Sequence, residues 1–227
     1  FDDLLEAALC GTWATDVLKA GTTRRSFTLE RSFADLATQE YHRFTGCEVN
    51  SIALSVAPNQ MVTLTIGWIG KDMTLNTSKV TGSTYAADAG ETPFDSFTGS
   101  ISEGGSTIAT VTALELTLEN GIEPLFSVGS STTNRPAIGK SRVTGSLTTY
   151  FESKTLFQKF VNETSSSISL VLTDLDGNDY TIDLSNVKYN SGQPDVAGEG
   201  AVTVAMDFVG LYDSTDQSNI KITRSTA

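Results

Sequence analysis

The sequence predicts a mainly β protein with two short α-helices. Apolar and polar residues alternate with a period of two along much of the 227-residue chain, which is typical of strands with one buried face. Nineteen glycines against five prolines favour tight turns between these strands. Hydrophobic residues make up 39% of the chain and charged residues 19%, which is typical of a folded protein.

The first half of the chain is expected to begin with a helix and to continue as strands. Apolar residues recur at helical spacing over residues 1–9, with Leu4 and Leu5 on the apolar stripe. Strands are expected over residues 26–30, 44–56 and 60–70. In the last of these, Leu64, Ile66 and Trp68 share the face that we expect to be buried. Residues 76–93 are rich in Thr, Ser, Gly and Ala, which predicts a linker or a long loop.

The second half repeats this pattern. Strands are expected over residues 112–119, 141–151, 167–173, 178–187 and 201–211. A second helix is expected over residues 153–163, with Leu156, Phe157 and Phe160 on its apolar stripe. In the last strand, Val204, Met206 and Phe208 share one face and are expected in the core.

The two halves match each other at constant spacing, which suggests a tandem duplication. Leu4 of the first helix precedes its counterpart Leu156 by 152 residues, and Val62 of the last strand precedes Val202 by 140 residues. We expect one repeat over residues 1–75, a linker or loop over residues 76–93, and a second repeat over residues 94–227. The second repeat has an additional strand before its helix, so we expect the first copy to be truncated at its N-terminus and the gene product to be longer. Chance similarity between alternating patterns is the alternative.

Charge and cysteine content exclude several classes of protein. The net charge is −12 and the isoelectric point is near 4.4, so the surface repels a phosphate backbone instead of binding it through released counterions. Two cysteines, Cys10 and Cys47, are too few for a disulfide scaffold and are expected to be reduced thiols. No apolar run reaches the roughly 18 to 20 residues that span a bilayer, so we expect no membrane contact.

Several stretches together resemble the tail tube proteins of siphophages, the bacteriophages with long, non-contractile tails. They are FDDLLEAAL, GTTRRSFTLERSF, YHRFTGCEVNSIALSVAPNQMVTLTIGWIGK, LELTLENGIEPLFSVGS and GEGAVTVAMDFVGLYDSTDQSNIKITR. The resemblance covers nearly the whole chain. It implies tube-type β-sandwich or barrel domains, each flanked by one short α-helix. Such domains form stacked six-fold rings, with the inner sheets closed into one β-barrel around a channel for viral DNA.

The resemblance also implies the partners of the chain. It implies a structural virion protein of the tail, neither an enzyme nor a cofactor-binding protein, assembled in the host bacterial cytoplasm. The partners would be further copies of the chain, in trimeric pseudo-hexameric or in hexameric rings, together with the tape measure protein and the tail-tip or terminator proteins. Viral DNA would pass through without specific binding.

Small, polar or acidic residues on the predicted strands are candidates for the channel wall, because such a wall does not hold duplex DNA. The candidate lumen-facing residues are Thr63, Thr65, Glu115, Thr203 and Asp207. A solvated outer face is the alternative for Glu115 and Asp207.

Other sites are less well supported by the sequence. His42 is the one histidine, and a packing or surface role is expected for it. Residues 174–179 resemble a calcium loop but lack its glycine and its glutamate at the required positions, so a hairpin turn is expected there. A carbohydrate-binding or adhesive β-sandwich module of a phage tail or cell surface is the alternative function, although Trp13 and Trp68 do not predict a common aromatic platform.

Overall fold

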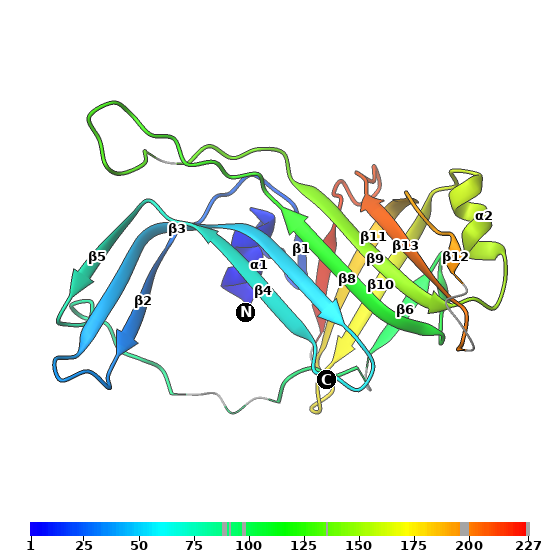
Figure 1. Cartoon of the computed structure of the whole chain (residues 1–227), viewed down its shortest axis with the longest axis horizontal. Coiled ribbons are helices and arrows are strands. Elements are labelled where there is room, and N and C mark those ends of the chain that lie inside the picture. Colours follow the sequence, from blue (N-terminus) through cyan, green and yellow to red (C-terminus); the bar gives the residue numbers. More distant parts are fainter. Residues whose placement is uncertain (88–89, 91, 97–98, 135, 196–199, 226–227) are drawn as a thin grey trace.

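The computed structural model confirms a mainly β fold in which antiparallel strands form one extended sheet (Figure 1). It describes residues 1–87, 90, 92–96, 99–134, 136–195 and 200–225. The two helices within these residues are α1 (Asp2–Leu9) and α2 (Thr155–Val161). The strands are β1 (Val17–Lys19), β2 (Phe27–Phe33), β3 (Glu40–Val56), β4 (Thr63–Ile69), β5 (Asp72–Asn76), β6 (Ser100–Glu103), β7 (Ser106–Thr107), β8 (Val111–Glu119), β9 (Arg142–Tyr150), β10 (Ser166–Thr173), β11 (Asp179–Tyr189), β12 (Pro194–Asp195), β13 (Thr203–Gly210) and β14 (Lys221–Ser225).

Strand β3 organises the first half of the sheet. It is 17 residues long, and its first part lies between β2 and β5 while its second part lies between β4 and β8. An irregularity between Val49 and Ser51 in the pairing with β4 marks the change of neighbours, as bulges commonly do. Beyond β8 the order of strands is β9, β13, β11, β10, β6 and β7, with β14 paired to β11 and β1 to β14.

The sheet folds back so that its alternating apolar positions meet in one buried cluster. Strands β3, β8, β9 and β13 contribute one set of side chains and β10, β11 and β14 contribute another. Leu118, Leu147, Met206, Leu184 and Ile222 are each at most 2% exposed. This arrangement follows from the period of two, because every second residue of each strand points to the same side.

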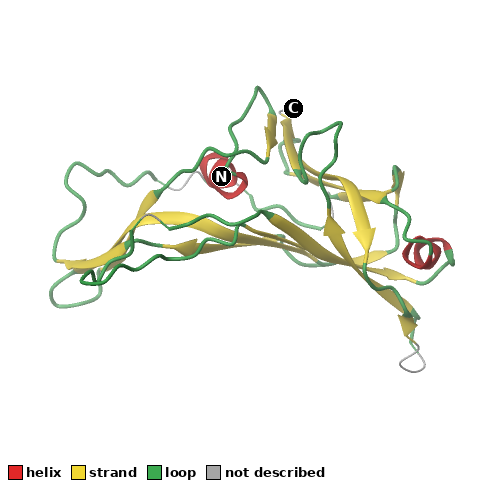
Figure 2. Cartoon of the chain, turned by 90° about the horizontal axis from the view of Figure 1, so that it is seen from above, coloured by secondary structure: helices red, strands yellow, loops and turns green. Residues whose placement is uncertain are grey.

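Helix α1 closes the cluster on the side of β3, and Figure 2 shows it on one side of the curved sheet. Leu5, Ala8 and Leu9 are buried, and Asp2 lies in the first turn, where a carboxylate interacts favourably with the helix dipole. The helix ends at Cys10, whose φ of 49° is left-handed. Helix α2 has no fully buried residue.

The long strands and both helices form where the alternation and the helical spacing predict them. Among the predicted core residues, Leu5, Val204, Met206 and Phe208 lie in the buried cluster. Leu64, Ile66, Trp68, Leu156 and Phe160 are partly buried and pack against it. Leu4 and Phe157 are partly exposed and lie outside it, because each short helix presents only part of its apolar stripe to the sheet.

Cys10 and Cys47 are both buried and unbonded to each other. Burial raises the pKa of both thiols above the ordinary value, which keeps them protonated and unreactive near neutral pH. Neither α1 nor α2, the helices of the described residues, has the length and apolar character needed to cross a membrane.

Candidate assembly surface

A row of small and polar side chains crosses five neighbouring strands on the face of the sheet that points away from the buried cluster. Thr63 of β4 lies opposite Ser55 of β3, which lies opposite Glu115 of β8. Glu115 lies opposite Ser146 of β9, which in turn lies opposite Asp207 of β13. Thr63, Glu115 and Asp207 are exposed. Three residues that lie far apart in the sequence thus share one line across the sheet.

Parallel rows have the same character. The next one places Thr65 opposite Ala53 and continues through Thr117 and Thr144. A further row runs through Gly67, Ser51, Glu119 and Arg142. Over the described parts of β4, β3, β8 and β9, Arg142 is the one basic residue of these rows. The row of Thr65 continues through Val209 of β13 to Lys188 of β11, so the acidic character of the face is concentrated on the row of Glu115 and Asp207.

The structure therefore brings four of the five candidate lumen residues together on the rows described above, and Thr203 lies opposite Tyr150 on the same strands β13 and β9. The sequence analysis missed Ser55, Ala53, Ser146 and Thr144, which complete the rows. The same alternation contains them, but only the register between strands shows that they are neighbours.

The second feature of the surface is an open strand edge. Over Thr63–Ile69, β4 pairs with β3, and no strand in the described part of the chain pairs with its other edge. Within the described residues, the cover is at the start of this edge, where the Val62 N–H donates to the Phe94 carbonyl at 2.9 Å and Met61 forms an isolated bridge with Asp95. Open edges are templates for pairing with another strand.

Strand β13 shows what fits such an edge. The hairpin of β3 and β4 and that of β11, β12 and β13 have the same register, displaced by 140 residues. Val49 opposite Trp68 corresponds to Tyr189 opposite Phe208, Leu54 opposite Leu64 to Pro194 opposite Val204, and Ser55 opposite Thr63 to Asp195 opposite Thr203. On β13, the edge that corresponds to the open edge of β4 is paired with β9 along its whole length.

The backbone groups available on the β4 edge follow from this correspondence. The Asn190 N–H donates to the Asp207 carbonyl on the β11 side of β13, and the Phe151 N–H donates to the Val202 carbonyl on the β9 side. By alternation, even-numbered residues of β13 face β9. On β4, where the Val62 N–H also points away from β3, the N–H groups of Leu64, Ile66 and Trp68 therefore face the open edge.

The residues considered for other chemistry lie elsewhere. His42 packs against the Phe33 ring at 4.6 Å between ring centroids. Asp174 accepts the N–H groups of Asp176 and Asn178 in the turn between β10 and β11, and within the described residues no group of three or more His, Cys, Asp or Glu side chains could hold a metal ion. Trp13 lies against Arg224 and Trp68 against Phe27, so the two indoles have separate partners.

A sheet with a polar face and a pairable edge defines a structural protein that is suited to assembly. Residues 1–210 match the family described as phage tail tube protein, and the chain belongs to that family. It is accordingly a structural component of a bacteriophage tail, as the resemblance to siphophage tail tube proteins indicated. No curated protein sequence matches the chain.

Solved structures give distant similarities. The cap of the anti-feeding prophage, a tube-terminating cap, is 12% identical, with 66% of this chain and 100% of that chain covered and a TM-score of 0.40. The tail tube of SPP1 is 12% identical, with 78% of this chain and 77% of that chain covered and a TM-score of 0.31.

Proposed function

We propose that copies of this chain join edge to edge into closed rings, and that stacked rings form the tube through which viral DNA leaves the capsid during ejection. The observation that carries the proposal is the correspondence between β4 and β13. One copy of the hairpin has its edge covered by β9, and the matching edge of the other copy is open.

The occupant of the open edge is an antiparallel strand from a neighbouring copy, in the register that β9 has on β13. Pairing there satisfies the outward N–H and C=O groups of Leu64, Ile66 and Trp68, which otherwise depend on water. Closing the sheet into a ring also removes the open edge, as barrels do.

The stoichiometry follows from the repeat. The shared register supports two tube-type repeats in one chain, residues 1–75 and 94–227 joined by residues 76–93, although the strands of both lie in one sheet. Three copies then make a pseudo-six-fold ring. Class averages from electron microscopy distinguish this ring, which has true three-fold symmetry, from a hexamer of six copies.

The face that carries Thr63, Thr65, Glu115, Thr203 and Asp207 would line the channel. Small hydroxyl groups give no strong contact with DNA, and Glu115 and Asp207 repel phosphates. DNA can then move through without specific binding. The tape measure protein would occupy the same channel before DNA, with tail-tip and terminator proteins at the two ends, after assembly in the host cytoplasm.

Hydrogen exchange on the wild-type protein tests the edge directly. In dilute monomer the amides of Leu64 and Ile66 face solvent and should exchange quickly, and in assembled particles they should become protected. The amide of Thr65 faces β3 and should be protected in both states, which makes it an internal control. Fast exchange at Leu64 and Ile66 within assembled particles would refute the edge pairing.

Ile66→Pro provides the matching variant. It removes one outward N–H without removing a hydrogen bond to β3, so the monomer should fold while ring formation, seen by negative-stain microscopy and sedimentation, is lost. Ile66→Val keeps the N–H and should still assemble. Rings formed by a folded Ile66→Pro variant would contradict the proposal.

A further inference from the structure

We propose that the connection between β8 and β9 docks its apolar tip into a pocket at the opposite end of a second copy, and that this contact joins one ring to the next. We call residues 120–134 and 136–141 the arm, and Leu125, Phe126 and Val128 its tip. The inference rests on the proposed function, since it specifies how the proposed rings stack.

The arm is internally ordered. Glu123 and Ala137 exchange two backbone hydrogen bonds of 3.0 Å each. Nearer the tip, the Asn134 N–H and the Thr133 hydroxyl both donate to the Leu125 carbonyl, at 3.0 and 2.7 Å, and Thr133 is 3% exposed. The arm therefore has a defined shape before any partner binds, which lowers the entropic cost of docking.

The arm is also firmly attached to the body of the protein. Asn120 is 2% exposed, and its amide donates to the carbonyls of Ala8 and Val49 at 2.8 and 3.0 Å. The Arg24 guanidinium donates to the Pro136 carbonyl at 2.6 Å. Helix α1, strand β3 and the segment before β2 thus fix the direction in which the arm projects.

The tip exposes apolar side chains that this ordering does not bury. Leu125 is 49% exposed, Phe126 is 69% exposed and Val128 is fully exposed. Isolated exposed apolar residues are common, but three within four positions of an ordered, projecting arm are typical of an interaction site. A tip of this kind requires a concave apolar surface on its partner.

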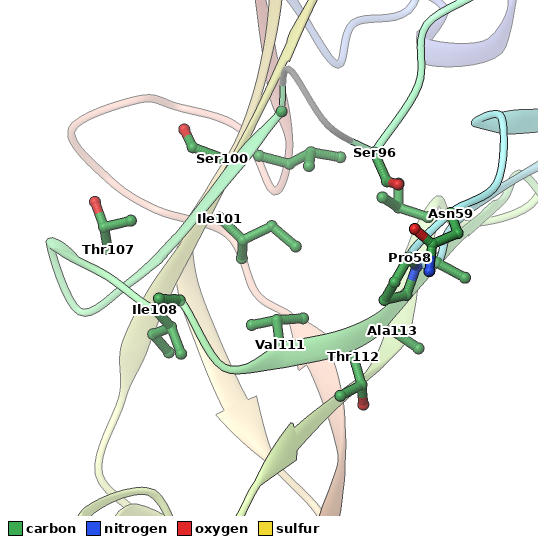
Figure 3. Close-up of a pocket in the computed structure, with 15 residues that line it drawn as sticks. Pro58, Asn59, Ser96, Ser100, Ile101, Thr107, Ile108, Val111, Thr112 and Ala113 are labelled. Atoms are coloured by element: carbon green, nitrogen blue, oxygen red, sulfur yellow. The ribbon is translucent and has the colours of Figure 1, made fainter.

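Such a surface lies where β8 begins. A pocket of about 410 Å³ is formed between the turn after β3, the strands β6 and β7, and the first residues of β8. Its apolar lining includes Pro58, Ile101, Ile108, Val111, Ala113 and Leu170, and Figure 3 shows the first five of these around it. Since a cavity of about 150 Å³ holds a benzene molecule, the pocket has room for the Phe126 ring and a neighbouring aliphatic group.

The tip and the pocket lie at opposite ends of the same strand. Val111, at the start of β8, lines the pocket, and the arm begins directly after Glu119, the end of β8. Nine extended residues at about 3.4 Å each separate the two by roughly 30 Å, and Figure 1 shows the arm projecting beyond the end of β8. The tip consequently fills the pocket of another copy and not its own.

A contact between two different surfaces of identical copies repeats head to tail, and it extends along an axis when the rotation between copies does not close into a ring. The tip and the pocket lie at opposite ends of β8, so this contact would displace each copy along the strand direction. Every copy carries both a tip and a pocket, so the tip of each copy can bind the pocket of the next. The edge of β4 closes the ring, and the tip and pocket would link successive rings. The two contacts can therefore be disrupted separately.

The test compares tubes of the wild-type protein with those of the double variant Phe126→Ser, Val128→Ser. The tip side chains are exposed, so the monomer should fold normally, and the protein concentration needed for tubes should rise roughly tenfold or more while single rings still form. Val161→Ser, at an apolar residue of α2 that is 59% exposed, is the matched control and should leave stacking unchanged.

Cysteine pairing provides a second measurement. Val128→Cys combined with Thr107→Cys places one thiol on the tip and one at the pocket, and the native cysteines are buried. Oxidised tubes should give disulfide-linked ladders of many copies. Normal stacking by the double serine variant, or oxidised tubes without ladders, would overturn the inference while leaving the rings intact. If the wild-type protein forms no rings at all, the proposed function fails, and the stacking contact fails with it.

Discussion

Phe208 lies directly opposite Gly145 on the neighbouring strand, and its ring occupies the space where a side chain of residue 145 would stand. A Cβ atom at position 145 would be 2.4 Å from Cζ of Phe208 and 2.3 Å from the Glu115 carbonyl oxygen. Phe208 is 1% exposed, so neither the ring nor the backbone has room to retreat. The glycine is required by this packing.

Gly145→Ala should therefore lower the free energy of unfolding by about 1–3 kcal/mol, the usual cost of overpacking a core. Urea denaturation followed by circular dichroism measures it. Gly200→Ala is the control, since a Cβ there meets nothing within 4 Å. Equal stability of the two variants would contradict the packing described here.

A partly buried ion pair between Glu103 and Lys159 connects α2 to the sheet. Glu103 is 6% exposed and accepts hydrogen bonds from Lys159 at 2.6 Å, from Ser166 at 2.6 Å and from Tyr189 at 3.0 Å. Glu103→Ala removes the acceptor of the Tyr189 phenol and leaves the partly exposed Lys159 ammonium with Ser166 and water, and it should cost about 1.5–3 kcal/mol. The denaturant midpoint should fall markedly, whereas Glu152→Ala, at an exposed position, should leave it nearly unchanged.

Stability should decline in alkaline solution because of two tyrosines. Burial, together with the Asp2 carboxylate, raises the pKa of Tyr180 to about 12, and burial, together with Glu103, raises the pKa of Tyr189 further. Unfolded tyrosine ionises near pH 10. The stabilising free energy that comes from these two protonated tyrosines is complete below that pH. It is lost as the pH rises from about 10 to 12, because the folded chain holds the phenol protons more tightly than the unfolded chain.

Urea midpoints measured from pH 8 to 12 test this dependence. Tyr180→Phe removes one of the two ionising groups and should make the decline shallower, although it also loses the hydrogen bond to Asp2. An alkaline decline as steep as that of the wild-type protein would show that Tyr180 does not contribute to it.

Reversing the charge on the polar rows should make the tube retain DNA. Glu115→Lys with Asp207→Lys places two cations on one row, and tubes of this variant should bind duplex DNA at low salt and release it as salt rises. Retention of DNA on assembled tubes measures this. Asp35→Lys with Asp176→Lys changes the net charge equally at exposed positions outside the rows, and equal retention by both variants would contradict the assignment of this face to the channel.

The alternation of apolar and polar residues was sufficient to predict the long strands and the helices. It was insufficient to predict which strands pair with one another. The alternation of Leu114, Leu116 and Leu118 predicts β8 because a strand with one buried face has that period. Strands such as β7 and β12, of two residues each, are too short to show a period. They are held in place by the tertiary pairing of their neighbours.

The candidate assembly surface could likewise be predicted only in part from the sequence. Thr63, Glu115 and Asp207 could be chosen one by one as polar strand residues, but that they lie on one row depends on pairings between strands far apart in the chain. The hydrogen bonds of Glu103 likewise reach partners 56 and 86 residues away. No spacing rule within a single segment contains such information.

The position of β8 has a mechanical consequence. It runs from the pocket to the root of the arm, flanked on both sides by antiparallel neighbours, β3 and β9. In a tail linked through the arm, a pulling force would travel along this strand and load its two ladders in shear, so that many hydrogen bonds resist together instead of opening one at a time. A filament built in this way would resist stretching along its axis.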